Sequence, residues 1–178
     1  MVKITVSGPP GSGTSTLVKT IVENYSWRSV NGGDIFRSEA KRRELTVGEF
    51  SDLCKEDLDV DRSLDSILKK ELQDPNGSEV IESRLSGWWA HSMAIECLRV
   101  WVNVSPEECA RRIQNREGGE FETQLQLSQQ RQMADKERYR ILYDIDLDDM
   151  SPYSLIIDAD SMDAEEVYSL VESSLRGN

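Results

Sequence analysis

Histidine and cysteine are scarce in this chain of 178 residues, and neither residue type suggests a site of its own. The single histidine, His91, argues against a histidine-based triad and against a multi-histidine metal site. Cys54, Cys97 and Cys109 have neither the spacing of zinc ligands nor the density of a disulfide scaffold. We interpret the cysteines as small buried apolar residues.

Long apolar runs are also missing. No stretch approaches the length that a membrane-spanning helix needs. The first expected strand begins at Val2, which leaves no room for a signal or transit peptide. We therefore expect a cytoplasmic protein with no membrane partner, folded as a single domain over residues 1–178 with a core of its own.

Positive charge is in short supply as well, since the formal net charge is −12. A broad nucleic-acid surface is therefore not expected, because phosphate contacts need clustered positive charge. Among the cations, 14 arginines outnumber 7 lysines, and guanidinium groups suit bidentate phosphate contacts. An acidic body with a few arginines around one cleft fits a small phosphorylated substrate. A generally acidic surface that keeps the protein soluble is the alternative.

Strand and helix signals alternate along the chain, which predicts an α/β fold with a mostly parallel sheet. The candidate strands are Val2–Val6, Trp27–Asn31, Glu79–Ile81, Val100–Val104 and Leu155–Asp158. We expect an exposed helix over Leu58–Leu72, and a helix that starts at Ser105-Pro106 and stops at Gly118-Gly119. The polar stretch Gly118–Thr123 is expected to move.

The richest segment is residues 8–16, which lie between the first strand and a helical pattern over Thr16–Glu23. Its spacing is that of a Walker A loop, G-x-x-x-x-G-K-[ST], in which backbone N–H groups and a helix N-terminus face an anion. The Ser15 hydroxyl would bind Mg²⁺. We predict that the whole run binds nucleotide phosphates: Gly8, Pro9, Pro10, Gly11, Ser12, Gly13, Thr14, Ser15 and Thr16.

Thr14 stands where the Walker A loop has lysine. Losing one charge-assisted hydrogen bond costs about 1.5–3 kcal/mol, so nucleotide binding would survive the change. Catalysis would suffer more, because the lysine charge also stabilises the transferring group. Our hypothesis is that arginines elsewhere replace this charge.

Two segments that follow expected strands place arginines at the same edge of the sheet. In residues 31–37, a second helix N-terminus is followed by Arg37, which would hold a second phosphate. Further on, Glu82 would hold a metal-bound water as a Walker B acid does, and Arg84 would grip the substrate phosphate. A solvent-exposed arginine and a structural Glu–Arg contact are the respective alternatives.

Two helical segments carry further arginines. Arg112 and Arg116 are four residues apart, so they share one helix face, and their helix ends at the expected mobile stretch. In the second segment, Arg131, Asp135 and Arg138 also share one helix face, because they are four and three residues apart. In both segments, ordinary surface ion pairs would give the same pattern.

The sequence contains no convincing histidine or aspartate base. Phosphoryl transfer mostly requires positioning and charge neutralisation, and an acceptor that is already a phosphate needs no base. The residues therefore favour a phosphate over a hydroxyl group as the acceptor.

These segments, in this order, resemble the nucleoside monophosphate kinases and most closely the archaeal-type cytidylate kinases. The resemblance covers nearly the whole chain, and its last segment, with Arg138-Tyr139 and Tyr143-Asp144-Ile145-Asp146, is the most distinguishing. The segments that carry it are GPPGSGTST (8–16), GGDIFR (32–37), IESRLSGW (81–88), ARRIQNRE (110–117) and RQMADKERYRILYDIDLDD (131–149).

The resemblance implies a P-loop kinase fold with a five-stranded parallel sheet flanked by helices, a monophosphate-binding insert near residues 34–75 and a short lid near 111–123. The implied reaction transfers a phosphoryl group from ATP to CMP or dCMP with Mg²⁺, in a protein expected to be a monomer. Residues 8–16 would bind ATP, with Ser15 and Glu82 at the metal. The acceptor would be bound by Arg37, Arg84, Asp135 and Arg138. The arginines that would close on the transferring group are Arg112, Arg116 and Arg131.

Two alternatives remain open. An adenylate kinase, or a kinase for another small metabolite, would carry similar phosphate clamps. A nucleotide-binding module without transfer activity is supported by Thr14 alone, and a pure binder needs no second phosphate site. The resemblance implies that threonine at this position is a trait of one branch of the family.

The hypothesis about arginines predicts that Thr14→Lys is tolerated. If other cations already supply the charge, ATP-dependent turnover of the variant should stay close to that of the native protein. A large gain in turnover would show that the native loop lacks compensation.

Overall fold

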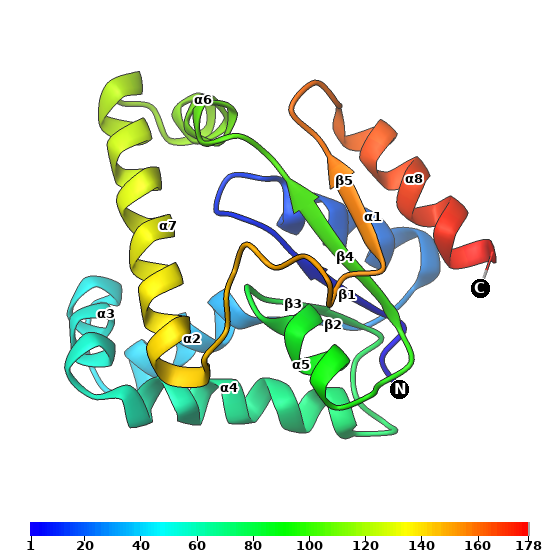
Figure 1. Ribbon diagram of the computed structural model, residues 1–178, viewed down its shortest axis with the longest axis horizontal. Coiled ribbons are helices and arrows are strands. Elements are labelled where there is room, and N and C mark those ends of the chain that lie inside the picture. The colour runs from blue at the N-terminus through cyan, green and yellow to red at the C-terminus, as the bar shows by residue number, and fades with distance from the viewer. Residues whose placement is uncertain (178) are drawn as a thin grey trace.

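The computed structural model describes the backbone of residues 1–177 and their side chains apart from those at positions 51, 55 and 56 (Figure 1). Five parallel strands form one sheet in the order β2-β3-β1-β4-β5. The strands are β1 (Ile4–Ser7), β2 (Ser29–Asn31), β3 (Val80–Glu82), β4 (Leu98–Asn103) and β5 (Leu155–Asp158). The sheet therefore has the parallel order expected of a P-loop kinase.

The helices connect and cover these strands. They are α1 (Thr14–Tyr25), α2 (Gly32–Arg42), α3 (Val47–Glu56), α4 (Leu58–Gln73), α5 (Ser86–Ser92), α6 (Pro106–Glu117), α7 (Phe121–Tyr143) and α8 (Ala164–Gly177). Helices α1 and α8 pack together on one face of the sheet, and α5 packs on the other face against β1 and β4.

The core is divided between the two faces of the sheet because side chains alternate along each strand. Ile4 and Val80 pack with residues of α1 and α8 in one cluster. Ile81 packs with residues of α4, α5 and α7 in another. The central strands are buried on both faces, as parallel strands covered by helices must be.

Helices α2, α3 and α4 form a projecting unit with a small core of its own, which we call the insert. Phe50 and Cys54 of α3 are fully buried there against Ala40 of α2 and Val60 of α4. The Thr46 capping box starts α3, and the Asp57 side chain caps α4. The insert therefore has a packed interior of its own beside the carboxyl edge of β2 and β3.

The structure corrects two expectations about helices. Helix α4 is not an exposed helix, because one of its faces buries Val60, Leu64 and Leu68. The polar stretch expected over Gly118–Thr123 is shorter than predicted, since α7 already begins at Phe121. Only the turn at 118–120 separates α6 from α7, and both of its glycines have positive φ angles.

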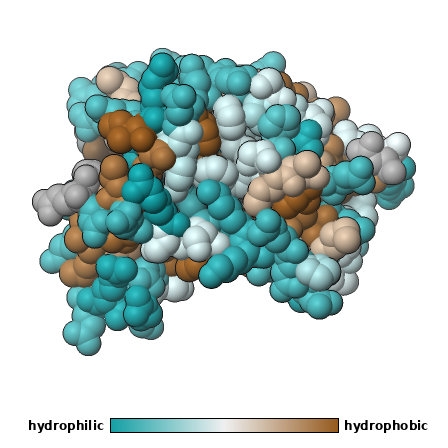
Figure 2. Space-filling view, turned by 60° about the horizontal axis from the view of Figure 1, so that its bottom comes forward, coloured by the Kyte–Doolittle hydropathy of each residue, from teal (hydrophilic) through white to brown (hydrophobic). Residues whose placement is uncertain are grey.

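The surface seen in Figure 2 is largely hydrophilic and the cysteines are buried or half-buried, as the composition predicts. Figure 2 shows hydrophilic residues surrounding separate hydrophobic patches on one face of the molecule. Within residues 1–177, no helix is long and apolar enough to cross a membrane. Cys54 and Cys109 are buried and Cys97 is half-buried, all as free thiols. Burial raises the pKa of each thiol to about 11, which keeps these groups protonated near neutral pH.

The buried core of the insert should contribute to the free energy of unfolding of the protein. Phe50→Ala removes a fully buried ring, so the free energy of unfolding should fall by about 3–5 kcal/mol in urea titrations. Val47→Ala in the same helix is the matched control, because Val47 is 53% exposed. Equal small losses in the two variants would contradict a packed core in this lobe.

Candidate active site

The loop between β1 and α1 contains the predicted phosphate-binding run, residues 8–16. Gly11 and Gly13 have φ angles of +90° and +93°, a region that favours glycine. Gly13 is the N-cap of α1 and offers no side-chain hydrogen bond to the first turn. The Ser12 hydroxyl is buried and has no hydrogen-bond partner among the described residues. The first turn of α1 therefore has no side-chain cap, an arrangement that can accommodate an anion.

A buried carboxylate joins this loop to the start of the insert. Ser15 Oγ donates to Glu82 Oε1 at 3.1 Å, and Asn31 Nδ2 donates to the other oxygen, Glu82 Oε2. Asn31 also caps α2, since its Oδ1 accepts from the backbone N–H of Gly33. The parallel register explains the arrangement, because Asn31 and Val6 lie on either side of Glu82 in neighbouring strands.

Arg84 lies directly against the phosphate-binding loop. Its Nη1 donates to the carbonyl oxygen of Gly8 at 2.7 Å, and its Nε lies 3.4 Å from Asp135 Oδ2. The guanidinium carbon is 5.9 Å from the centre of the Trp101 ring. Arg84 also lines a cavity of about 280 Å³ together with Pro9, Trp101 and Lys136. The predicted substrate arginine is therefore anchored at the loop.

Asp135 connects Arg84 to a second half-buried arginine, Arg138 on α7. Arg138 Nη2 lies 3.0 Å from Asp135 Oδ1, and its Nε lies 3.6 Å from Asp61 Oδ2 of the insert. Burial raises the pKa of the Asp61 carboxyl, an effect that the Arg138 charge opposes. Alternating charges thus run from the loop through α7 to α4.

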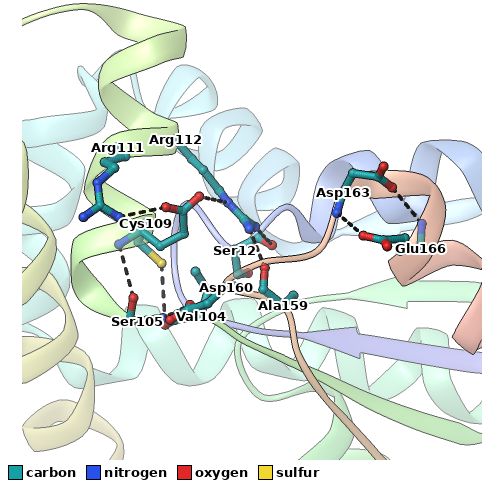
Figure 3. A network of polar contacts seen from close by, with 11 residues as sticks. Ser12, Val104, Ser105, Cys109, Arg111, Arg112, Ala159, Asp160, Asp163 and Glu166 are labelled. Carbon is teal, nitrogen blue, oxygen red and sulfur yellow. Dashed lines mark hydrogen bonds and ion pairs between the residues drawn. The ribbon is translucent and has the colours of Figure 1, made fainter.

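On the other side of the loop, Arg112 crosses from α6 to the phosphate-binding run (Figure 3). Its Nη1 donates to the Ser12 carbonyl at 3.1 Å, and its Nη2 donates to the Ala159 carbonyl. Its Nε donates to Glu108 Oε1 at 2.9 Å. This hydrogen bond lowers the pKa of the Glu108 carboxyl. Three contacts hold the guanidinium group in one place.

Arg112 also borders a cavity of about 510 Å³ that opens beside the loop. Such a volume suits a nucleobase and its sugar. Asp160 lies at this cavity and accepts a hydrogen bond from the Ser105 N–H, which lowers the pKa of its carboxyl. Residues that line the cavity include Gly13, Leu17, Arg112, Asp160, Met162 and Val167.

Of the six predicted arginines, three are exposed, and a fourth, Arg138, contacts Asp135 and Asp61 rather than the loop. Arg37 is exposed near the start of α2, where it forms an ion pair with Asp34 at 2.7 Å. Arg116 is exposed and pairs with the adjacent Glu117. Arg131 is exposed on α7. The structure therefore brings Arg84 and Arg112 to the phosphate-binding run and leaves these three at its periphery.

Three residues of the site have no role in the sequence analysis. Asn31 joins Glu82 to α2, and an asparagine directly before Gly-Gly is an N-cap signal that predicts its position. Asp61 shares the buried face of α4 with Leu64 and Leu68. The sequence did not point to Asp61 because this helix was expected to be exposed. Asp160 borders the larger cavity, and no pattern in the sequence points to it.

The fold and the loop define the class of protein, and comparisons with known proteins agree. A family model described as an AAA domain matches residues 7–127. The shikimate kinase of Bacteroides thetaiotaomicron superposes with a TM-score of 0.62 at 18% identity, covering 98% of this chain and 97% of that one. At this identity the likeness concerns the fold, which is that of the P-loop kinases.

The comparisons with curated proteins are more specific. The cytidylate kinase of Archaeoglobus fulgidus is 38% identical over 169 residues, which are 95% of this chain and 92% of the relative. That of Methanocaldococcus jannaschii is 35% identical over 174 residues, 97% of this chain and 96% of the relative. The chain belongs to the cytidylate kinase family, which confirms the resemblance drawn from its motifs.

The position of the Glu82 carboxylate between Ser15 and Asn31 leads us to expect that turnover depends on its charge. Glu82→Gln removes the charge and keeps the shape, so ATP-dependent turnover at limiting Mg²⁺ should fall about 10–100-fold. Turnover should partly recover as Mg²⁺ is raised. Glu79→Gln is the matched control, because Glu79 directly precedes the same strand and pairs with Arg28 away from the loop. Similar turnover in the two variants would contradict a metal role for Glu82.

Proposed function

We propose that this protein is a nucleoside monophosphate kinase that transfers the γ-phosphoryl group of ATP to CMP or dCMP. The observation that carries the proposal is the link between two helix starts at the carboxyl edge of the sheet. The Ser15–Glu82–Asn31 hydrogen bonds join the N-terminus of α1 to that of α2. Relatives named cytidylate kinase match nearly the whole chain and support CMP as the acceptor.

The donor nucleotide is assigned to the loop and to the larger cavity. The phosphates of ATP would lie against residues 8–16, where the backbone N–H groups and the α1 dipole favour negative charge. Its base and sugar would occupy the cavity of about 510 Å³ beside Arg112 and Asp160. Arg112 would then touch both the loop and the donor.

The acceptor is assigned to the side of the insert. Arg37, Arg84, Asp135 and Arg138 are the proposed binding residues. The CMP phosphate would lie between Arg84 and the start of α2, and the insert over residues 34–75 would cover the nucleoside. Because the acceptor is already ionised, no side chain has to remove a proton from it. His91 is exposed on α5, which fits a reaction without a histidine base.

The residues at the loop also fit a magnesium ion. A serine hydroxyl and a carboxylate are hard oxygen ligands, and Mg²⁺ is usually held by few protein groups, substrate phosphates and water. Ser15 and Glu82, 3.1 Å apart, would hold it. When bound, the ion neutralises charge on the phosphates.

The segment near residues 111–123 is proposed as the lid. Its turn of Gly118 and Gly119, both at positive φ, is a place where α6 and α7 can change their angle. Closing would bring Arg116 and Arg131 from the periphery toward the transferring group and exclude water, which would otherwise hydrolyse ATP. A cytoplasmic monomer is part of this proposal, and the free thiols suit a reducing compartment.

A substrate panel tests the proposal. With ATP and Mg²⁺ fixed, a coupled assay should give the highest kcat/KM for CMP or dCMP, with lower values for UMP and AMP. The expected preference rests on contacts to the base, which distinguish related substrates by differential binding.

Two outcomes of the same panel would contradict the proposal. A preference for AMP would make the protein an adenylate kinase. ATP binding without turnover of any monophosphate would make it a binding module, as a loop without the Walker lysine would allow.

A further inference from the structure

The phosphate-binding loop lacks the cation that its pattern calls for, because Thr14 stands in the lysine position. That lysine normally reaches the β- and γ-phosphates of the donor. Among the described residues, two arginines donate hydrogen bonds to the loop: Arg84 to the Gly8 carbonyl and Arg112 to the Ser12 carbonyl. The geometry of Thr14 distinguishes between them.

The Thr14 side chain points across the loop toward Gly8. A Cβ placed on Gly8 would lie 3.0 Å from Thr14 Cγ2. A side chain at position 14 therefore leaves the backbone beside Gly8. The guanidinium group of Arg84 arrives at the same residue from the end of β3, where its Nη1 donates to the Gly8 carbonyl at 2.7 Å. The two side chains converge on one residue of the loop.

The position of the Arg84 side chain is also fixed by its surroundings. Its side chain is only 12% exposed, against 60% for Arg37. Trp101 lies under the guanidinium group, and Asp135 holds its Nε side. Asp135 is shared with Arg138 at 3.0 Å, so its charge is divided between two arginines. One carboxylate shared by two arginines neutralises Arg84 only in part, so its guanidinium group still attracts an anion at the loop.

Arg112 is a poorer replacement for the lysine. All three of its nitrogens are engaged, with Glu108 and with the carbonyls of Ser12 and Ala159. It pairs with Glu108 at 2.9 Å and faces the larger cavity. This position suits the nucleoside end of the donor rather than its terminal phosphates.

We propose that Arg84 supplies the positive charge that the Walker lysine provides elsewhere, and so acts as a catalytic residue toward the donor as well as the acceptor. This inference rests on the proposed phosphoryl transfer. In that step an oxygen of the acceptor phosphate bonds to the γ-phosphorus. The bond from the γ-phosphorus to the β–γ bridging oxygen breaks, and its electron pair stays on ADP. The guanidinium group would neutralise the charge that develops there.

A rescue experiment tests the inference. Arg84→Gln should lower kcat about 100-fold, the usual cost of losing one transition-state donor. Adding Thr14→Lys to Arg84→Gln should restore kcat at least about tenfold, because a lysine reaches the phosphates from the other side of Gly8. Arg112→Gln is the matched control, since adding Thr14→Lys to it should restore nothing.

Further measurements separate a role in catalysis from a role in folding. Arg84→Lys keeps the charge, so it should retain more kcat than Arg84→Gln. Melting temperatures identify any variant that fails to fold, and comparison of the double variant with Arg84→Gln stays valid if Thr14→Lys alone is impaired. An unchanged kcat in Arg84→Gln would overturn the inference. So would a raised KM for CMP with no recovery on adding the lysine, because Arg84 would then serve the acceptor alone.

Failure of the proposed function would be visible separately. If the native protein phosphorylates none of the monophosphates, the kinase assignment fails whatever Arg84 does. In that case, two measurements test the role of Arg84: the rate of ATP hydrolysis without an acceptor, and the affinity for ATP. Arg84→Gln should weaken both, and the added lysine should restore both. If the lysine restores neither, the inference fails as well.

Discussion

The buried carboxylate of Glu82 is the interaction on which the site depends. It accepts from Ser15 at the start of α1 and from Asn31 at the start of α2, so one side chain fixes two helix N-termini relative to each other. The parallel register of β1, β3 and β2 brings these groups to a common edge. A charged group that is only 8% exposed is costly to bury unless it is hydrogen-bonded. Its partners meet that requirement and, by their positions, bring the proposed donor and acceptor sites together.

Charge is distributed unevenly between the surface and the site. The chain carries a net charge of −12, yet two arginines, Arg84 and Arg112, lie half-buried against the phosphate-binding loop. Arg84 is held by Asp135 and one carbonyl oxygen, and Arg112 by Glu108 and two carbonyl oxygens, which orients both guanidinium groups. Preorganised donors of this kind favour developing negative charge without further rearrangement. On our proposal, Arg84, which follows β3, supplies the cation that the loop itself lacks.

The sequence was sufficient to predict the sheet, the phosphate-binding loop and the family, because each is encoded by short local patterns such as residues 8–16. It did not predict which arginines meet the loop. Arg112 and Arg116 share a helix face by spacing, yet Arg112 contacts Ser12 and Arg116 pairs with Glu117 at the surface. Such contacts depend on how far each side chain reaches and on which carboxylates compete for it. Neither factor produces a repeating pattern in the sequence. Asp61 was missed for a related reason, since the burial of α4 follows from its packing in the insert.

We infer that donor and acceptor phosphates meet at the carboxyl edge of β1 and β3, beside Gly8 and Arg84. A crystal structure with a non-hydrolysable ATP analogue, Mg²⁺ and CMP measures this most directly. We expect the triphosphate within residues 8–16 and the CMP phosphate on the insert side, with Arg84 in hydrogen-bond contact with both ligands. Binding of CMP away from Arg84, with no contact between the two nucleotides, would contradict it.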